Sequence, residues 1–179
     1  MGVRPKPKKL NEEQLWEYAL RALGQRAHSV NELRQKMLRR AEAVGQVEAT
    51  LAKLKEYGLT DDLKFSEAFA AARLENQGFG SFRVLRELRA KNVAATTAAE
   101  AIAKTYSASP EPELIAAFLR RKYRNQNLHE LLQEQKNVAS VYRRLRTAGF
   151  TSSGSIAALK QYASTIEEWG EPPEEEPGE

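Results

Sequence analysis

The chain has 179 residues, and its 28 lysines and arginines against 24 acidic residues give a formal net charge of +4 at pH 7. It contains no cysteine, which excludes disulfides, zinc–thiolate sites and thiol nucleophiles. No stretch approaches the roughly 18 apolar residues that a membrane span needs, and the N-terminus has no apolar leader. We therefore expect a cytoplasmic protein without membrane association.

The charge is divided unevenly along the chain. Seven of the 24 acidic residues lie at 167–179 and no basic residue follows Lys160, so residues 1–166 carry 28 basic against 17 acidic residues. A basic body favours a polyanionic partner, although a solvated surface with a solubilising tail is the alternative. The tail, which includes Trp169, has too little apolar surface to fold alone. We expect it to be disordered or, in a second hypothesis, to fold back on the basic surface as a competitor.

Helical periodicity dominates the first third of the chain. Asn11 with Gln14, and Ser29 with Glu32, are capping boxes that predict two helix starts, and Gly58 predicts the end of a third helix. No segment alternates with a period of two, so strands are not predicted. The apolar residues recur every three or four positions, as one buried helix face requires: Leu15, Trp16, Ala19, Leu20, Leu23, Leu33, Met37, Val47, Leu51 and Leu54.

The same pattern restarts twice, which is typical of a repeat protein. The acidic pair Asp61 and Asp62 predicts a further helix start, because the helix dipole favours negative charge there. Thr97 with Glu100 predicts another capping box, and a third cycle begins at Ser109. The middle helices of the three cycles can be overlaid at two core positions four residues apart, namely Leu33, Val84 and Val141, and Met37, Leu88 and Leu145.

These signals predict an all-α fold, an elongated array of three tandem three-helix repeats. We place the repeats at residues 11–59, 60–108 and 109–165, with a basic disordered N-terminal tail at 1–10 and an acidic disordered C-terminal tail at 166–179. Single units of about 50 residues are marginal alone, so we expect stacking against a neighbour to stabilise each of them.

Residues that could carry out catalysis are sparse. The two histidines, His28 and His129, lie near expected loops without a paired acid. The glycines at 78–80 lack the lysine and the serine or threonine of a phosphate loop. Asp61 and Asp62 are adjacent, which favours helix capping over paired acid–base work. We therefore expect no enzyme activity, no cofactor, no metal and no small-molecule substrate.

The basic residues cluster on the helices. Equivalent basic helices in tandem would form a positive stripe suited to phosphates or to an acidic protein groove, although long basic side chains can also merely cover helix surfaces. The exposed positions are nearly all arginine, without the amides that read base edges, so sequence-specific DNA recognition is not favoured. As partner-contacting residues we single out Arg83, Arg86, Arg89, Lys91, Arg120, Arg121, Arg143 and Arg146.

Several stretches resemble the RecX family. Residues 57–69 read YGLTDDLKFSEAF and are followed by GFG at 78–80 and RVLRELRAKNV at 83–93. The family's central signature is similar: a glycine with an apolar residue, an acidic pair, an aromatic residue, a glycine turn and a helix with arginine and glutamate. SVNELRQK at 29–36 and LRTAGF at 145–150 resemble its second helix and terminal turn. The resemblance spans about residues 12–162, and departs from the family pattern at Ser66, Asn92, Val93 and 43–45.

The resemblance implies a regulator of the RecA recombinase. RecX proteins are tandem three-helix-repeat proteins that bind RecA, lodge in the groove of its filament on single-stranded DNA and limit filament growth. They thereby lower ATP hydrolysis, strand exchange and SOS co-protease activity. We therefore expect the RecA filament as the partner, possible direct contact with single- or double-stranded DNA, and a monomer. Two other functions stay open: a general DNA-binding protein whose affinity falls steeply with salt, and a neutral helical scaffold whose binding is insensitive to salt.

Overall fold

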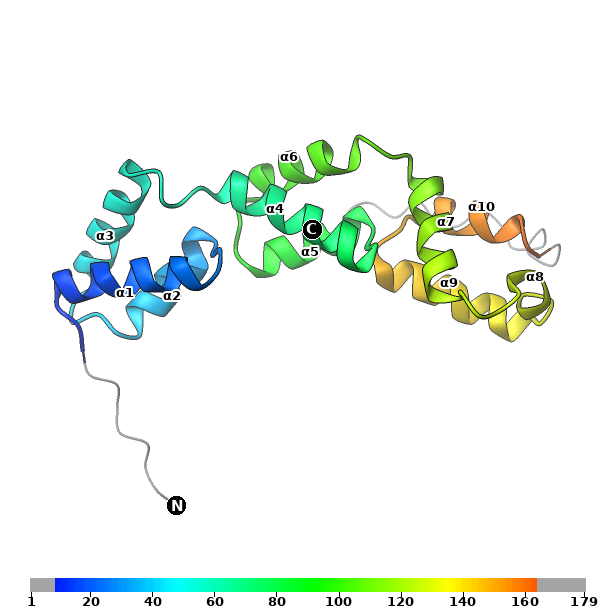
Figure 1. The fold of residues 1–179 in the computed structure, drawn as a ribbon, viewed down its shortest axis with the longest axis horizontal. Helices are drawn as coiled ribbons and strands as arrows, with labels where there is room; N and C mark the ends of the chain where they lie inside the picture. The colour runs from blue at the N-terminus through cyan, green and yellow to red at the C-terminus, as the bar shows by residue number, and fades with distance from the viewer. Residues whose placement is uncertain (1–8, 164–179) are drawn as a thin grey trace, which may run out of the picture. The chain divides into compact units, whose positions relative to one another are not determined.

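The computed structural model describes residues 9–163 (Figure 1). Within that range the chain forms ten helices and no strand, apart from a single parallel bridge between Leu10 and Ala41. This confirms the prediction of an all-α fold. The acidic tail expected at 166–179, with Trp169, lies outside the described residues, as do the first eight residues.

The first repeat consists of three helices that pack in pairs: α1 (Glu12–Gln25), α2 (Val30–Leu38) and α3 (Val44–Glu56). Both predicted capping boxes are confirmed. Asn11 Oδ1 accepts the N–H of Gln14 at 3.0 Å, and Ser29 Oγ accepts that of Glu32 at 3.1 Å. The core between the helices consists of Leu15, Ala19, Ala22, Leu33, Met37, Ala41, Val47, Leu51 and Leu54. The expectation that Leu20 lies on the buried face of α1 is wrong, because the residue is 38% exposed.

The next three helices are α4 (Asp62–Gln77), α5 (Ser81–Ala90) and α6 (Ala95–Tyr106). Asp61 caps α4 as predicted, since its Oδ1 accepts two backbone N–H groups of the first turn at 2.9 and 3.1 Å. The capping box predicted at Thr97 is wrong, because α6 begins two residues earlier and the Ala98 N–H already donates to the Ala94 carbonyl. Alanine has the highest helix propensity, so the alanines before Thr97 extend the helix past that signal.

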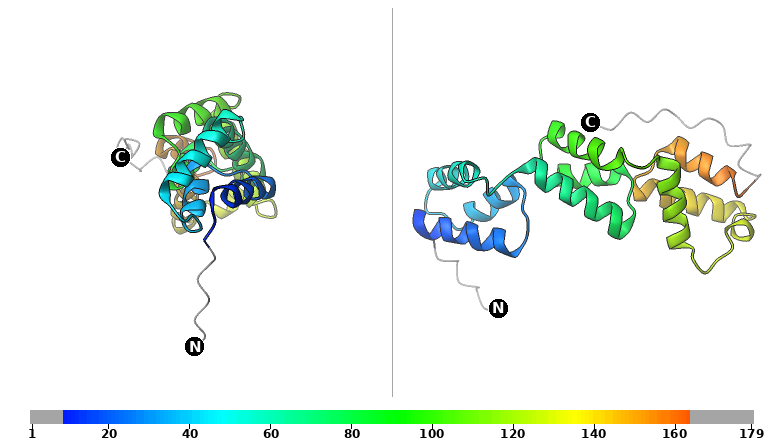
Figure 2. Two further views of the ribbon diagram at one scale, coloured as in Figure 1. Left: turned by 90° about the vertical axis from the view of Figure 1, so that its left-hand side faces the viewer. Right: turned by 45° about the horizontal axis from the view of Figure 1, so that its top comes forward.

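The last four helices are α7 (Glu111–Lys122), α8 (Leu128–Leu131), α9 (Gln135–Ala148) and α10 (Ser152–Lys160). α10 packs on both α7 and α9, and Figures 1 and 2 agree in placing these three helices side by side. Phe118 and Phe150 meet edge to face with ring centroids 5.6 Å apart. Around them lies a core that contains Ile115, Leu119, Leu132, Val138, Val141, Leu145, Ile156 and Leu159.

The overlay of the middle helices agrees with their burial and with their ends. All six overlaid core residues are at most 2% exposed. α5 and α9 end in the same motif, in which the N–H of the residue that directly follows the turn residue donates to the carbonyl five residues earlier at 3.2 Å. The turn residue has a left-handed conformation in both, with Asn92 at φ +55° and Gly149 at φ +94°. Asparagine tolerates this conformation better than most residues, so the departure from the family pattern at Asn92 preserves the turn.

The chain divides into two compact units. The first unit comprises residues up to 66 together with 88–98, and the second comprises 67–87 together with the residues from 99 onward. The helices of the middle repeat are therefore shared between the two units. The junction of the first and middle repeats lies inside the first unit, and the junction of the middle and third repeats lies inside the second.

Candidate partner-binding groove

In the second unit, the turn before α5 lies against the turn after α9. The Gly80 N–H donates to the Ala148 carbonyl at 2.8 Å, and the Phe82 N–H donates to the Gly149 carbonyl at 3.2 Å. The terminal carbonyls of α9 thus satisfy N–H groups at the start of α5, which follows a glycine and so has no side-chain cap at that position. A Cβ at Gly80 would lie 2.8 Å from the Phe150 nitrogen and closer still to the Gly149 carbonyl. Only glycine fits this approach.

A tyrosine holds the same turn. Tyr106 on α6 donates its hydroxyl to the Phe79 carbonyl at 2.7 Å. Burial, and secondly the carboxylate of Glu87, raise the pKa of Tyr106 above its ordinary value, so the phenol stays protonated and remains a donor. Phe79 is thereby fixed where the guanidinium of Arg83 lies over its ring, 3.6 Å from the centroid.

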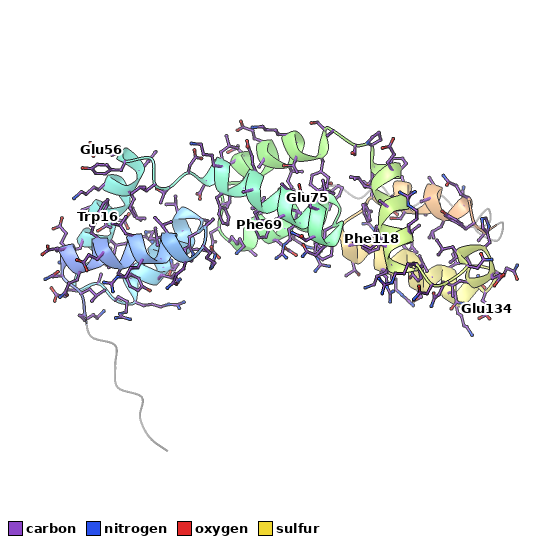
Figure 3. The ribbon with its side chains drawn as sticks, viewed as in Figure 1. Trp16, Glu56, Phe69, Glu75, Phe118 and Glu134 are labelled. Atoms are coloured by element: carbon purple, nitrogen blue, oxygen red, sulfur yellow. The ribbon has the colours of Figure 1, made fainter. Side chains whose placement is uncertain are left out.

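A groove with a volume of about 780 Å³ lies at this junction, and we call it the basic groove. Its lining comes from the end of α4, the following turn, α5, α7 and α9. Phe79 and Phe118 supply its apolar part, and Figure 3 shows Phe118 on the side of α7 that faces the end of α4. The described residues that line it include no carboxylate but five cations: Arg83, Arg121, Lys122, Arg143 and Arg144.

Two of these cations are held by protein groups on the facing repeat. Arg83 Nη1 donates to the Thr147 carbonyl at 3.3 Å, while its Nε pairs with Glu87 at 3.1 Å. Arg121 Nη1 donates to the carbonyls of Asn76 at 3.2 Å and Glu75 at 3.4 Å. These carbonyls belong to the last turns of α9 and α4, where the helix dipole favours a positive charge. Both arginines are therefore positioned by the junction.

The other three cations of the basic groove have no acidic partner among residues 9–163. Lys122, Arg143 and Arg144 form no ion pair there, and Arg144 instead lies over the ring of Tyr123 at 5.5 Å from its centroid. Glu111 begins α7 at the opposite end from Lys122, and it accepts the N–H of Thr151 at the start of α10 at 2.8 Å. The groove consequently carries a positive charge that the described residues do not neutralise.

The structure places the eight residues chosen from the sequence in different surroundings. Arg83, Arg121 and Arg143 come together in the basic groove. Arg86 and Arg120 are exposed but do not line it. The lining also contains Lys122 and Arg144, which sequence reasoning did not select. The sequence feature that could have identified them is their position in the basic clusters, since each directly follows a chosen arginine.

The remaining three chosen residues lie outside the basic groove. Arg146 is half-buried, and its Nη1 donates to the Phe150 carbonyl at 2.6 Å, so it ties down the end of α9. Arg89 and Lys91 belong to the first unit. Arg89 is exposed, whereas Lys91 pairs with Glu32 at 2.7 Å.

Glu32 neutralises the junction inside the first unit. Its carboxylate accepts from Lys91 Nζ at 2.7 Å and from Arg26 Nη1 at 3.2 Å. Burial acts to raise the pKa of Glu32, but the hydrogen bonds and charges of Lys91 and Arg26 outweigh it and lower the pKa to about 2. Ser29 Oγ also donates to the Lys91 carbonyl at 2.9 Å. The smaller hollow at this junction, about 210 Å³, therefore contains its own counter-charge.

The two junctions differ in charge because of one position in the repeat. The overlay aligns Glu32 of the first repeat with Arg83 of the second, one residue before the first core position. Each side chain reaches the end of the next repeat's middle helix, Glu32 through Lys91 and Arg83 through the Thr147 carbonyl. A carboxylate makes the first junction self-neutralised, and a guanidinium adds to the positive charge of the second.

Between residues 9 and 163, no group of three or more histidine, aspartate or glutamate side chains is placed to hold a metal ion. None of the helices in that range combines the length and the apolar composition that crossing a membrane requires.

Comparison with known proteins gives consistent results. A family model described as the second three-helix domain of RecX matches residues 61–102. Regulatory protein RecX of Halorhodospira halophila is 43% identical over 76 residues, which cover 42% of this chain and 47% of that protein. Regulatory protein RecX of Deinococcus radiodurans is 30% identical over 174 residues, which cover 96% of this chain and 77% of the relative. A crystal structure of regulatory protein RecX matches with a TM-score of 0.66 and 23% identity, over 84% of this chain and 71% of that one.

The helices and the groove define a helical-repeat protein with a basic groove at the junction of two repeats. The likeness to the solved structure supports that fold. The chain belongs to the RecX family, because its 30% identity to the Deinococcus protein extends over 96% of this chain and 77% of that relative. The matches to the RecX proteins of Halorhodospira halophila and Pelodictyon phaeoclathratiforme are shorter. They span about half the length of those relatives, 47% and 52%.

Proposed function

We propose that this chain is a non-enzymatic regulator of the RecA recombinase that binds the groove of the RecA filament on single-stranded DNA. Binding limits filament assembly and so lowers ATP hydrolysis, strand exchange and SOS co-protease activity. The proposal places the protein in the cytoplasm as a monomer. It is supported by membership of the RecX family and carried by one observation: three cations of the basic groove have no acidic partner among the described residues.

The basic groove is the proposed contact surface. Lys122, Arg143 and Arg144 contribute charge that is not neutralised, while Arg83 and Arg121 contribute donors that the junction holds in place. The proposed set is completed by the other basic residues chosen from the sequence, namely Arg86, Arg89, Lys91, Arg120 and Arg146.

The chemistry of the groove suits carboxylates and phosphates alike. A guanidinium offers paired N–H donors that match either group. Each exposed contact contributes about 0.2–1 kcal/mol, so several contacts together give a binding free energy of a few kcal/mol that weakens with salt. Charges further apart than the Debye length of about 8 Å are screened at physiological ionic strength. A partner that fits the groove closely is therefore favoured over a distant polyanion.

The experiment measures ATP hydrolysis by the cognate RecA on single-stranded DNA, with this protein added well below one molecule per RecA subunit. Affinity for the bare strand is measured beside it. The test variant is Arg143→Ala with Arg144→Ala, and the matched control is Lys55→Ala with Arg124→Ala. The control removes the same charge from exposed positions outside the groove.

We expect the wild-type chain and the control to lower hydrolysis at protein levels too small to sequester the strand. The groove variant should need about tenfold more protein for the same effect, the equivalent of 1.4 kcal/mol. Hydrolysis that stays unchanged, or that falls only in proportion to sequestered DNA, would contradict the proposal. If the groove variant and the control variant lowered hydrolysis equally, the groove would not be the surface that contacts the partner.

The groove also favours a second candidate, a general DNA-binding protein. Five cations without a lining carboxylate could hold a phosphate backbone directly. This candidate predicts an affinity for bare single strands whose logarithm falls with log salt at a slope of about −0.7 per phosphate contacted, hence roughly −2 to −4 here. RecA activity should then fall only as the strand is covered.

A further inference from the structure

We propose that the acidic segment at residues 167–179 of this chain binds the basic groove of the same molecule and competes there with the polyanionic partner. The groove is then covered in the free protein, and a partner must displace the segment. This inference rests on the groove being the contact surface of the proposed function and adds a mode of regulation for that surface.

Charge complementarity is the first argument. The segment contains seven glutamates and no basic residue within 13 positions. The basic groove presents five cations, of which Lys122, Arg143 and Arg144 have no ion pair among residues 9–163. Glutamate carboxylates bind guanidinium groups through the same paired hydrogen bonds as phosphates do. The segment therefore offers the ligand chemistry that the groove lacks within the described part of the chain.

The junction of the first and middle repeats offers less to an acidic segment than the basic groove does. The hollow at the junction in the first unit is also lined by basic residues, but Glu32 lies among them and pairs with Lys91 and Arg26. A second carboxylate there would meet an ion pair that is already formed. The position that holds Glu32 in the first repeat holds Arg83 in the second, which directs the segment to the basic groove.

The chain is long enough to reach the groove. The described residues end at Ala163, directly after α10, and α10 packs on α7 and α9, both of which line the groove. α9, the longest of these helices with 14 residues, spans about 21 Å. The 16 residues that follow Ala163 can span at most about 53 Å when extended. Glutamates near the middle of this stretch can therefore contact the groove.

Covalent attachment makes a weak contact effective. A short flexible connection gives an effective concentration in the millimolar range, so individually weak ion pairs can keep the groove occupied. The same weakness allows displacement by a partner with more contacts, and it makes the occupancy sensitive to salt. If the segment fills the groove in about four of five molecules, the apparent affinity for a competing polyanion falls about fivefold.

The experiment uses the full chain and a fluorescein-labelled single-stranded oligothymidine as the polyanion. Its affinity is measured by anisotropy at salt near about 20 mM and about 300 mM, where the Debye length differs by severalfold. The tail variant replaces with glutamine Glu167, Glu168, Glu171, Glu174, Glu175, Glu176 and Glu179. We expect this variant to bind about fivefold more tightly at low salt, with the difference lost at high salt.

A double-variant comparison separates groove occupancy from a general effect of net charge. The tail variant is combined with Arg143→Ala and Arg144→Ala, and in parallel with Lys55→Ala and Arg124→Ala. Only the groove pair should abolish the gain in affinity. A gain of equal size in both backgrounds would overturn the inference, as would the absence of any gain. A gain that depends on protein concentration would assign the groove to the segment of a second copy, and would also overturn it.

The free protein supplies an independent readout. In a Trp16→Phe chain, Trp169 is the single tryptophan and lies within the acidic segment. Its quenching by acrylamide should be weaker at low salt than at high salt, and the groove pair of substitutions should remove this difference. Quenching that ignores both salt and the groove would contradict the inference. Because neither readout uses RecA, this outcome is distinct from failure of the proposed function.

Discussion

Replacing Gly80 with alanine tests the junction of the middle and third repeats. The added Cβ would lie 2.8 Å from the Phe150 nitrogen and closer still to the Gly149 carbonyl, which are backbone atoms of the facing turn. The facing turn must therefore move away, and two hydrogen bonds are strained, from Gly80 to Ala148 and from Phe82 to Gly149. Backbone conformation is not the cause, because Gly80 is not among the glycines with positive φ.

The magnitude follows from these contacts. Each hydrogen bond contributes about 1 kcal/mol net, and overpacking a close contact costs about 1–3 kcal/mol. We therefore expect Gly80→Ala to lower the free energy of unfolding by roughly 3–5 kcal/mol. For a chain of this length that corresponds to a fall in Tm of about 10 °C. Urea and thermal unfolding followed by circular dichroism at 222 nm, the α-helical band, measure both quantities.

Gly24→Ala is the matched control. Gly24 lies in the last turn of α1, is exposed, and would place its Cβ more than 4 Å from any neighbouring group. Alanine should therefore stabilise the helix there by about 0.5–1 kcal/mol. A free energy of unfolding of Gly80→Ala within about 1 kcal/mol of the wild-type value would contradict this reasoning. The two turns would then not approach each other closely in solution, and the geometry of the groove would have to be revised.

Three further predictions concern the first unit. Asn92→Gly should leave the chain at least as stable in urea, whereas Asn92→Ala should cost about 1 kcal/mol, because φ +55° suits glycine and disfavours alanine; equal stability of the two variants would contradict this. The pKa of Glu32, about 2 in the folded chain, lies below its ordinary value of 4.5. Its stabilisation is therefore present above pH 4.5 and lost as pH falls through about 2, and Glu32→Gln should remove roughly 2 kcal/mol of that pH dependence. Asp62 Oδ1 accepts the Val30 N–H at 2.8 Å, so Asp62→Ala should cost about 1–2 kcal/mol while Asp62→Asn, which keeps an acceptor, costs less.

Features set by local sequence were predictable. Asn11, Ser29 and Asp61 cap helices because a side-chain oxygen two or three residues before a backbone N–H needs no distant partner. The overlaid core positions, such as Leu88 and Leu145, follow from a period that every amphipathic helix shares. The wrong prediction at Thr97 also concerns local sequence. The capping signal of Thr97 and the helix propensity of the alanines before it favoured different starts, and the helix begins at Ala95.

Features that depend on which helices meet were not predictable. Helical periodicity shows that Arg143 faces away from its own core, but it does not show that α4 and α7 bring Arg121 beside it. Arg146 was chosen as a partner contact, yet it turns back to the Phe150 carbonyl, because carbonyls at a helix end need donors. Lys122 and Arg144 entered the groove through the same tertiary arrangement, which spacing along one helix does not encode.

Because carbonyls at the end of α9 cap the start of α5, the middle repeat depends on the third repeat in a way that it does not depend on the first. The start of α5 relies on carbonyls near residue 148, whereas the end of α5 gives the Lys91 carbonyl to the Ser29 hydroxyl of the repeat before it. If the first repeat were removed, the Lys91 carbonyl would accept a hydrogen bond from water instead, at little cost in free energy. N–H groups released by losing the third repeat begin a helix that follows a glycine and has no side-chain cap at that position. Shortening from the front should thus be better tolerated than shortening from the back, and during synthesis the middle repeat gains its final support only once the last one has folded.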